Sequence, residues 1–314
     1  MKTLRIGTRG SPLALWQARA VEQAVSARGG TPCQTVVIKT TGDRVATRPL
    51  STIGGKRLFV KEIEDALLTG SVDLAVHSAK DLPADLPPDL MIGATLPRED
   101  PRDALALPIS SRGAPGGDTT RLIASLGPTP RVGTGSVRRV AQLSRLYPSA
   151  RFMPIRGNVE TRLRKLDADE YDVLVLATAG LVRLDLARRV SARLPVSDCL
   201  PAPGQGIVAI EIRASDRATA AVLAQVNDQD AMSALEAERS LVKALEGDCQ
   251  VPIGALATLD AGTLKLDAVV ASLDGKRVLR RCSHGPVGAA GALGEDLARQ
   301  LLDDGADAIL AQHR

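Results

Sequence analysis

The chain has 314 residues, more than one ordinary hydrophobic core accommodates, so two or three domains are expected. Hydrophobic residues make up 44% and charged residues 24%, which is a globular composition, but aromatic residues make up only 2%. The net charge of +4 is small. Without a concentrated basic face or stacking aromatic residues, the chain is not expected to bind nucleic acid.

The N-terminus and the cysteines indicate a cytoplasmic protein. Residues 1–6 (MKTLRI) lead straight into a strand-like pattern, without the apolar core of a signal peptide or an Arg- and Ser-rich transit segment. No apolar run approaches the roughly 20 residues that cross a bilayer. The four cysteines are scattered, which favours reduced thiols and disfavours a metal site: Cys33, Cys199, Cys249 and Cys282. A monomer that contacts no membrane is the default expectation.

Strand and helix signals alternate over residues 1–95, which predicts βαβ units around a largely parallel sheet. Strands are predicted at Leu4–Thr8, Gln34–Lys39 and Val72–His77. One helix is predicted from Ser11-Pro12 to Val25, because serine caps helices and proline fits the first turn, and another at Val60–Leu68. The polar segment Thr40–Lys56 is predicted to be a mobile loop.

Two proline-bearing breaks divide the following part of the chain. The first, Pro97–Asp103, is interpreted as a linker, and the second, Leu200–Gly206, precedes an isolated strand at Ile207–Ile212. Between the breaks, strands that are each followed by a helix signal are predicted at Arg131–Thr134, Arg151–Ile155 and Asp172–Ala177. We therefore predict a discontinuous first domain (1–97 and 201–216) and a second domain inserted into it (103–197).

The remaining residues, 220–314, have a different order of elements. The predicted elements are a helix at Ala231–Leu245, strands at Ile253–Leu259, Leu264–Ser272 and Arg277–Ser283, and a helix from Val287. This order favours a small α+β domain with an antiparallel sheet. The predicted fold class is therefore α/β, with two α/β domains and a small C-terminal α+β domain.

Three arginine-bearing segments each follow a predicted strand and open a predicted helix. They are residues 8–11 (TRGS), 133–139 (GTGSVRR) and 156–159 (RGNV). Helix N-termini attract anions, and guanidinium groups bind carboxylates in a bidentate way. Any one segment is compatible with solvated arginines, but three on one sheet edge predict a pocket for several carboxylates or phosphates.

Two further segments contain residues suited to chemistry. Asp81 follows a strand, where it is either half of a weak surface ion pair with Lys80 or a stabiliser of a developing cation. Cys249 lies in a loop bounded by glycine and proline, where a thiol is accessible as a nucleophile or covalent anchor. The other cysteines are interpreted as small buried hydrophobes. A Cys/His hydrolase fits poorly, because none of the three histidines is obviously paired with Cys249.

Ordered motifs along essentially the whole chain make it similar to the porphobilinogen deaminase (hydroxymethylbilane synthase) family. They include TRGSPLA at 8–14, GGK at 54–56, HSAKD at 77–81, REDPRDA at 98–104, VRR at 137–139, RGNV at 156–159, PGQG at 203–206 and GDCQVPIG at 247–254. The resemblance implies a transferase of tetrapyrrole and heme biosynthesis, with two domains like periplasmic binding proteins and a third that carries a covalent dipyrromethane cofactor. Four porphobilinogen molecules would be joined head to tail with loss of ammonia, and linear hydroxymethylbilane would be hydrolysed off.

The resemblance also implies roles for individual residues. Cys249 would carry the cofactor through a thioether, and Asp81 would be catalytic, contacting pyrrole N–H groups and stabilising an azafulvene-like electrophile. Cofactor carboxylates would be bound by Lys80, Thr134, Ser136, Arg138, Arg139 and Arg156. Substrate or the growing chain would be contacted by Arg9, Ser11, Arg156, Arg183, Gln205 and, on the mobile loop, Lys56.

Three residues depart from the family's pattern: Gly135 replaces a usual serine, Asp248 a usual glycine, and Arg57 a common glycine. Two other functions remain compatible with the arginines. A two-lobed anion-binding protein is disfavoured by the third domain and by the missing signal peptide. An enzyme acting on phosphorylated metabolites predicts no covalent adduct on Cys249.

Overall fold

The structure, a computed structural model, describes residues 3–44, 60–111, 118–246 and 251–313. The chain separates into two compact units: unit 1 is Met1–Glu99 with Ile207–Leu235, and unit 2 is Asp100–Gly206 with Glu236–Arg314. Two residues with predicted functions, Lys56 and Cys249, lie outside the described residues. The division into three domains stays a prediction.

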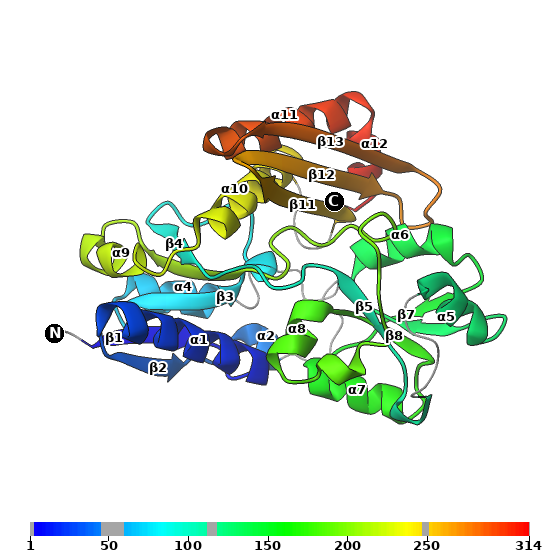
Figure 1. The fold of residues 1–314 in the computed structure, drawn as a ribbon, viewed down its shortest axis with the longest axis horizontal. Coiled ribbons are helices and arrows are strands. Elements are labelled where there is room, and N and C mark those ends of the chain that lie inside the picture. The colour runs from blue at the N-terminus through cyan, green and yellow to red at the C-terminus, as the bar shows by residue number, and fades with distance from the viewer. Residues whose placement is uncertain (1–2, 45–59, 112–117, 247–250, 314) are drawn as a thin grey trace. The chain divides into compact units, whose positions relative to one another are not determined.

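Unit 1 is built on a sheet with the strand order β2-β1-β3-β10-β4 (Figure 1). Its strands are β1 (Leu4–Thr8), β2 (Cys33–Val37), β3 (Leu74–Ser78), β4 (Leu90–Thr95) and β10 (Val208–Arg213). Strand β1 is parallel to β2 and β3, whereas β10 is antiparallel to β3 and β4. The predicted strand at Ile207–Ile212 is confirmed, and it returns the chain to the first sheet.

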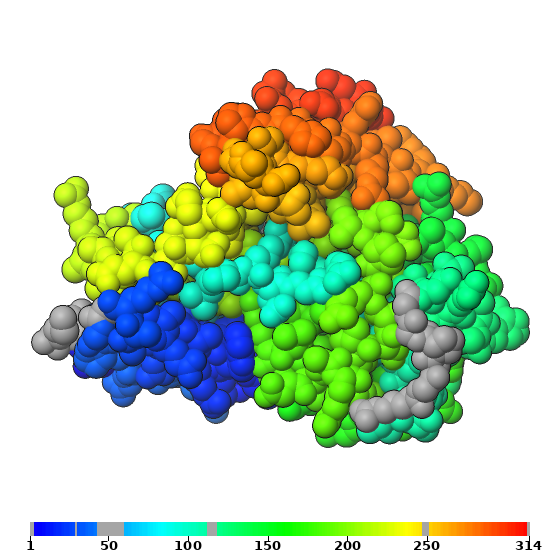
Figure 2. Space-filling view, viewed as in Figure 1, coloured from blue at the N-terminus to red at the C-terminus, as the bar shows by residue number. Residues whose placement is uncertain are grey.

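The helices of unit 1 are α1 (Pro12–Gly29), α2 (Thr41–Arg44), α4 (Lys61–Leu68) and α9 (Arg217–Leu223), and α10 (Gln229–Ala244) starts in this unit. Helices α1 and α9 begin after residues whose side chains cap them, Ser11 and Asp216. Ser11 Oγ accepts a hydrogen bond from Ala14 N at 3.3 Å, and Pro12 follows in the first turn, as predicted. Apolar side chains from β1, α1, β3 and β10 form one buried cluster. Both stretches of unit 1 reach the surface, blue and yellow-green in Figure 2.

The first sheet of unit 2 has the order β7-β6-β8-β5-β9. Its strands are β5 (Asp103–Ala106), β6 (Arg131–Gly133), β7 (Arg151–Met153), β8 (Val173–Ala177) and β9 (Ala192–Arg193), and its helices are α5 (Thr119–Ser125), α6 (Val137–Leu146), α7 (Val159–Asp167) and α8 (Thr178–Arg183). Strand β6 is parallel to β7 and β8, and β5 is antiparallel to β8 and β9. The predicted linker is wrong at its end, because Asp103 starts an inner strand.

The C-terminal part of unit 2 is an antiparallel sheet with the order β11-β12-β13. Its elements are β11 (Ile253–Asp260), β12 (Thr263–Ala271), β13 (Val278–Pro286), α11 (Ala290–Asp303) and α12 (Ala306–Leu310). Leu293, Leu297 and Leu301 recur every fourth residue on α11 and are buried, so they form the apolar stripe of this helix. The predicted fold class, α/β with a small C-terminal α+β part, is confirmed.

The three arginine-bearing segments do not share one sheet edge, so that expectation is wrong. The segment with Arg9 follows β1 in the sheet of unit 1, whereas those with Arg138 and Arg156 follow β6 and β7 in unit 2. Alternating strand and helix signals identify the end of a strand, but the assignment of strands to sheets depends on long-range pairing.

Candidate anion-binding site

Two of the arginine-bearing segments lie side by side in unit 2. They follow the paired parallel strands β6 and β7, and Thr134 N donates a hydrogen bond to Met153 O at 3.0 Å. A Cβ atom at Gly135 would lie 3.0 Å from Ile155 O, so the glycine permits this close approach. The segments 134–136 and 155–157 therefore occupy one edge of the sheet, where ligands of α/β proteins bind.

The helices that start at this edge are capped by their own sequence. Ser136 Oγ accepts a hydrogen bond from Arg139 N at 3.4 Å at the start of α6. Asn158 Oδ1 accepts one from Thr161 N at 2.9 Å at the start of α7. Because β6 and β7 are parallel, the two helix N-termini begin at the same edge and both favour negative charge there.

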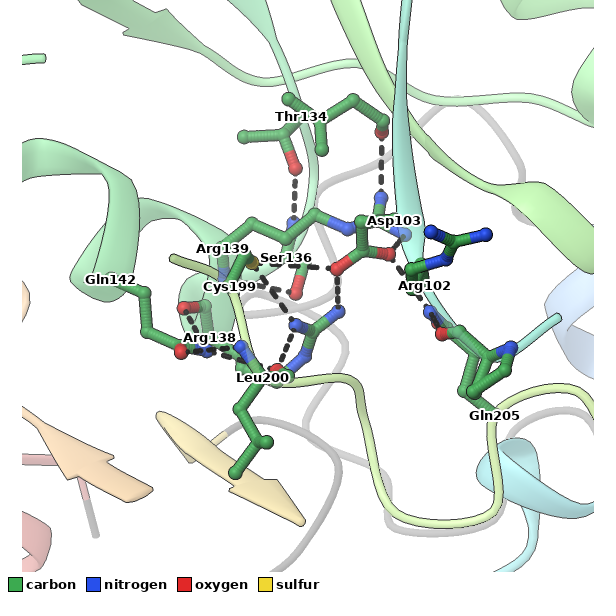
Figure 3. A network of polar contacts seen from close by, with 12 residues as sticks. Arg102, Asp103, Thr134, Ser136, Arg138, Arg139, Gln142, Cys199, Leu200 and Gln205 are labelled. Carbon is green, nitrogen blue, oxygen red and sulfur yellow. Dashed lines mark hydrogen bonds and ion pairs between the residues drawn. The ribbon is translucent and has the colours of Figure 1, made fainter. Parts of the chain in front are cut away.

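A buried carboxylate lies between the two neighbouring arginines of α6 (Figure 3). Asp103 Oδ2 lies 2.7 Å from Arg138 Nη2, and Asp103 Oδ1 lies 2.8 Å from Arg139 Nη2. Asp103 is fully buried, and Arg138 and Arg139 are only 4% and 5% exposed. Gln205 Nε2 donates to Asp103 Oδ1 at 2.9 Å and to Pro101 O at 2.6 Å. Two guanidinium groups therefore share one carboxylate, which leaves the cluster with a net positive charge.

The remaining Nη atoms of both arginines donate to the main chain. Arg138 Nη1 lies 2.6 Å from Leu200 O, and Arg139 Nη1 lies 2.6 Å from Val175 O. The Nε atoms of both side chains are buried and have no hydrogen-bond partner among the described residues. Native proteins satisfy most buried polar atoms, so two unpaired N–H groups in one charged cluster indicate a missing acceptor.

The cluster controls the protonation of its own acidic groups. Burial alone would raise the pKa of the Asp103 carboxyl, but Arg138 and Arg139 reverse this effect and lower it well below its usual range. Burial and the charge of Asp103 raise the pKa of Cys199 to about 12, so this thiol stays protonated. Cys199 is fully buried, as predicted, and a protonated thiol is a poor nucleophile. The same prediction is wrong for Cys33, which is partly buried, and for Cys282, which is exposed on β13.

Two other predicted arginines of unit 2 differ in their surroundings. Arg156 is partly buried, and its burial lowers the pKa of the guanidinium. No hydrogen bond or ion pair of Arg156 is found among the described residues, although Arg162 Nε holds the neighbouring Gly157 O at 2.8 Å. Arg183 is 7% exposed and its Nη2 donates to Gly206 O at 2.6 Å.

The predicted site residues of unit 1 that the structure describes lie at the carboxyl ends of β1 and β3. Arg9 follows β1, and the short helix η1 (Ala79–Asp81), which contains Lys80 and Asp81, follows β3 directly. Because β1 and β3 are parallel neighbours, Arg9 and Asp81 belong to the same sheet edge. Asp81 is exposed, whereas Arg9 and Lys80 are partly buried.

The sequence-based prediction missed Asp103 and Arg162. The prediction places Asp103 at the end of a charged, proline-bearing linker, although the apolar run 104–107 that follows it is typical of a buried strand. An acidic residue at the start of such a run needs a buried partner, and this was the available signal. Arg162 lies within α7 and resembles an ordinary surface arginine in the sequence.

Comparisons with known proteins cover nearly the whole chain. A family model described as "Porphobilinogen deaminase, dipyromethane cofactor binding domain" matches residues 4–221, and "Porphobilinogen deaminase, C-terminal domain" matches residues 232–303. A porphobilinogen deaminase of Syntrophobacter fumaroxidans is 47% identical over 312 residues, which cover 99% of this chain and 98% of that protein. Another, of Chromobacterium violaceum, is 46% identical over 314 residues, covering 99% and 98%.

Solved structures with a similar chain path are more distant. The periplasmic VFT2 domain of Bordetella pertussis BvgS matches with a TM-score of 0.41 and 16% identity, over 71% of this chain and 86% of that chain. Immunogenic lipoprotein A of Vibrio vulnificus matches with a TM-score of 0.40 and 10% identity, over 75% and 99%. Within the described ranges, no helix has the length and apolarity to cross a membrane, and no three His, Cys, Asp or Glu side chains are grouped to hold a metal.

Proposed function

The chain belongs to the porphobilinogen deaminase family, and we propose that it builds a linear tetrapyrrole on a dipyrromethane cofactor anchored at Cys249. Family membership makes it a transferase that polymerises porphobilinogen in tetrapyrrole biosynthesis and uses a dipyrromethane cofactor. The bound cofactor supplies a covalent primer with a nucleophilic pyrrole carbon. In the proposed reaction, four porphobilinogens are joined head to tail. Each loses ammonia and forms one carbon–carbon bond, and hydrolysis finally releases hydroxymethylbilane.

The buried cluster of Arg138, Arg139 and Asp103 is the observation that best supports the proposed carboxylate site. Porphobilinogen carries an acetate and a propionate, so every condensation brings two more carboxylates to the protein. The cluster has one positive charge more than Asp103 neutralises, and both Nε atoms lack acceptors among the described residues. Arg156, whose pKa burial lowers, would also be stabilised by an anion. We propose that cofactor carboxylates are bound by Arg138, Arg139 and Arg156, together with Lys80, Thr134 and Ser136.

Asp81 is proposed as the catalytic carboxylate. Loss of ammonia from porphobilinogen leaves a cationic electrophile, which a nearby carboxylate stabilises most strongly when it is already in place. The exposed position of Asp81 directly after β3 supports access to a ligand. Substrate and the growing chain are proposed to contact Arg9, Ser11, Arg156, Arg183, Gln205 and Lys56.

Intact-mass measurement of the purified protein tests this proposal. Wild-type protein should carry the added mass of two deaminated porphobilinogens, which Cys249→Ala should lack together with activity. Cys33→Ala and Cys282→Ala, matched removals of one thiol, should keep both. A wild-type mass equal to the bare chain, despite supplied porphobilinogen, would instead favour an anion-binding protein or an enzyme on phosphorylated metabolites. Action as a monomer in the cytoplasm, without nucleic-acid or membrane partners, stays a prediction.

A further inference from the structure

Both carboxylate oxygens of Asp103 accept hydrogen bonds from other protein groups. Oδ1 accepts from Arg139 and Gln205, and Oδ2 accepts from Arg138 and, at 3.4 Å, from the Cys199 thiol. A carboxylate offers about four lone-pair sites, so these donors use its accepting capacity. Asp103 is therefore unsuited to bind a ligand and suited to hold the two arginines.

Gln142 holds Arg138 in a second, indirect way. It lies one helical turn after Arg138 on α6, and its amide pairs with the peptide groups of Leu200 (Figure 3). Leu200 N donates to Gln142 Oε1 at 2.8 Å, and Gln142 Nε2 donates to Leu200 O at 3.1 Å. The same Leu200 oxygen accepts from Arg138 Nη1. Gln142 is only 6% exposed. It therefore holds Leu200 O in place, and Leu200 O in turn binds the guanidinium group of Arg138.

We propose that Asp103 and Gln142 are positioning residues for Arg138 and Arg139. This inference rests on the proposed function and assigns a role to two residues that bind neither substrate nor cofactor. Neighbouring guanidinium groups repel each other, and Asp103 holds them together before an anionic ligand arrives. Gln142 keeps the Leu200 peptide from turning. The arginines then meet a pyrrole carboxylate in one prepared orientation, which lowers the entropic cost of binding.

The test uses protein without cofactor and measures how fast dipyrromethane forms from porphobilinogen, by intact mass. Gln142→Met keeps the side-chain length and charge but removes both hydrogen bonds to Leu200. We expect assembly to slow about tenfold, because small displacements of a binding group have effects of that order or larger. An unchanged rate would contradict the role of Gln142.

A double-mutant cycle separates positioning from a structural role. If Gln142 acts through Arg138, Arg138→Leu with Gln142→Met should assemble the cofactor about as slowly as Arg138→Leu alone. A further tenfold loss in the double variant would make Gln142 a general stabiliser and overturn its assignment. Thermal unfolding of the four proteins, recorded alongside, shows any stability change that accompanies the rates.

Asp103→Asn is compared with Asp172→Asn. Asp172 also pairs with an arginine, because its Oδ1 lies 2.7 Å from Arg131 Nη2. It precedes β8, whereas Asp103 lies opposite Ala177 at the other end of β8, so Asp172 is a carboxylate away from the arginine cluster. Asp103→Asn should slow assembly at least as much as Gln142→Met, and Asp172→Asn should keep the wild-type rate. If Asp103→Asn does not fold, the Gln142 cycle decides alone.

The wild-type protein in the same assay distinguishes the two levels of inference. A wild type that neither forms the cofactor nor consumes porphobilinogen would contradict the proposed function. If the wild type is active and both Gln142→Met and Asp103→Asn assemble the cofactor at the wild-type rate, only the positioning role is overturned.

Discussion

Asp103 Oδ2 lies 2.7 Å from Arg138 Nη2, and both side chains are buried. Replacing Asp103 with asparagine leaves two buried guanidinium groups without a carboxylate. Removing one partner of a buried ion pair typically costs about 3–5 kcal/mol. We expect Asp103→Asn to lose free energy of unfolding on this scale at neutral pH, as measured by urea denaturation.

The same carboxylate should make stability depend on acidity. Its pKa is lowered in the folded chain, whereas in the unfolded chain it is near the ordinary value of about 3.9. Below that pH the unfolded chain binds a proton that the folded chain does not, so this stabilisation is lost as the pH falls. Urea unfolding between pH 3 and 7 should therefore show a steeper acid loss for wild type than for Asp103→Asn. Parallel curves would show that Asp103 does not contribute.

Asp81→Asn tests the proposed stabilisation of the cation. The substitution keeps the size of the side chain and removes its charge, so the cofactor should still be attached. We expect kcat to fall on the order of 10²–10³-fold, the effect of removing one preorganised electrostatic group. Asp89→Asn, an exposed position of the same unit, should retain wild-type turnover. A kcat for Asp81→Asn within a few-fold of wild type would leave Asp81 without a catalytic role.

The proposed arginines should matter at different stages of chain growth. With limiting porphobilinogen, native mass spectrometry should show a ladder whose steps each equal one porphobilinogen minus ammonia. Arg138→Leu and Arg139→Leu should impair cofactor assembly, whereas Arg9→Leu and Arg183→Leu should carry the cofactor and stall later, since each new ring brings its own carboxylates. Uniform slowing of every step would mean that the arginines act only as a general positive field.

A control arginine is available on the surface of α7. Arg164 is exposed on the helix that follows Arg156. Arg164→Leu removes the same charge without removing a proposed carboxylate ligand, and it should give the wild-type ladder. If chain growth also stalls in Arg164→Leu, the net charge of the protein, rather than the position of each arginine, determines how far the chain grows.

Gly254 permits a close backbone contact near the arginine cluster. A Cβ atom there would lie 2.8 Å from Leu200 O and 2.9 Å from Val269 Cγ1. Gly254→Ala should reduce stability by about 1–3 kcal/mol, a usual cost of overpacking, and should slow cofactor assembly by displacing the carbonyl that binds Arg138. Gly288→Ala, where a Cβ atom meets nothing within 4 Å, is the matched control. Equal melting temperatures for the two variants would contradict the steric argument.

Local signals predicted much of the fold. The cap at Ser11, the apolar run of β8 and the leucine spacing of α11 each depend on residues close in sequence. Strand β4 (LMIGAT) is not predicted, because it follows a proline-rich segment and no helix signal separates it from β3. Its only strand partner among the described residues is β10, far along the chain.

The site was less predictable than the fold. The order of strand and helix signals identified three arginine-bearing segments, the family resemblance added roles for individual residues, and the sequence neighbours of the arginines explain the helix caps. The burial of Arg138 and Arg139 depends on Asp103, which comes from another strand, and on Gln205 and Leu200, which come from a later loop. A sequence in isolation suggests exposed arginines, because charged side chains are almost never buried unless they are paired.

The position of β10 in the first sheet has a consequence for synthesis on the ribosome. Strand β4 is made early, but it joins β3 only through β10, which ends at Arg213. Until that residue has emerged, β3 and β4 each present an unpaired edge, and the nascent N-terminal segment cannot complete its sheet. Residues 100–206 emerge in between and contain every strand of the sheet β7-β6-β8-β5-β9 in unit 2. The segment translated second can therefore finish its sheet before the segment translated first.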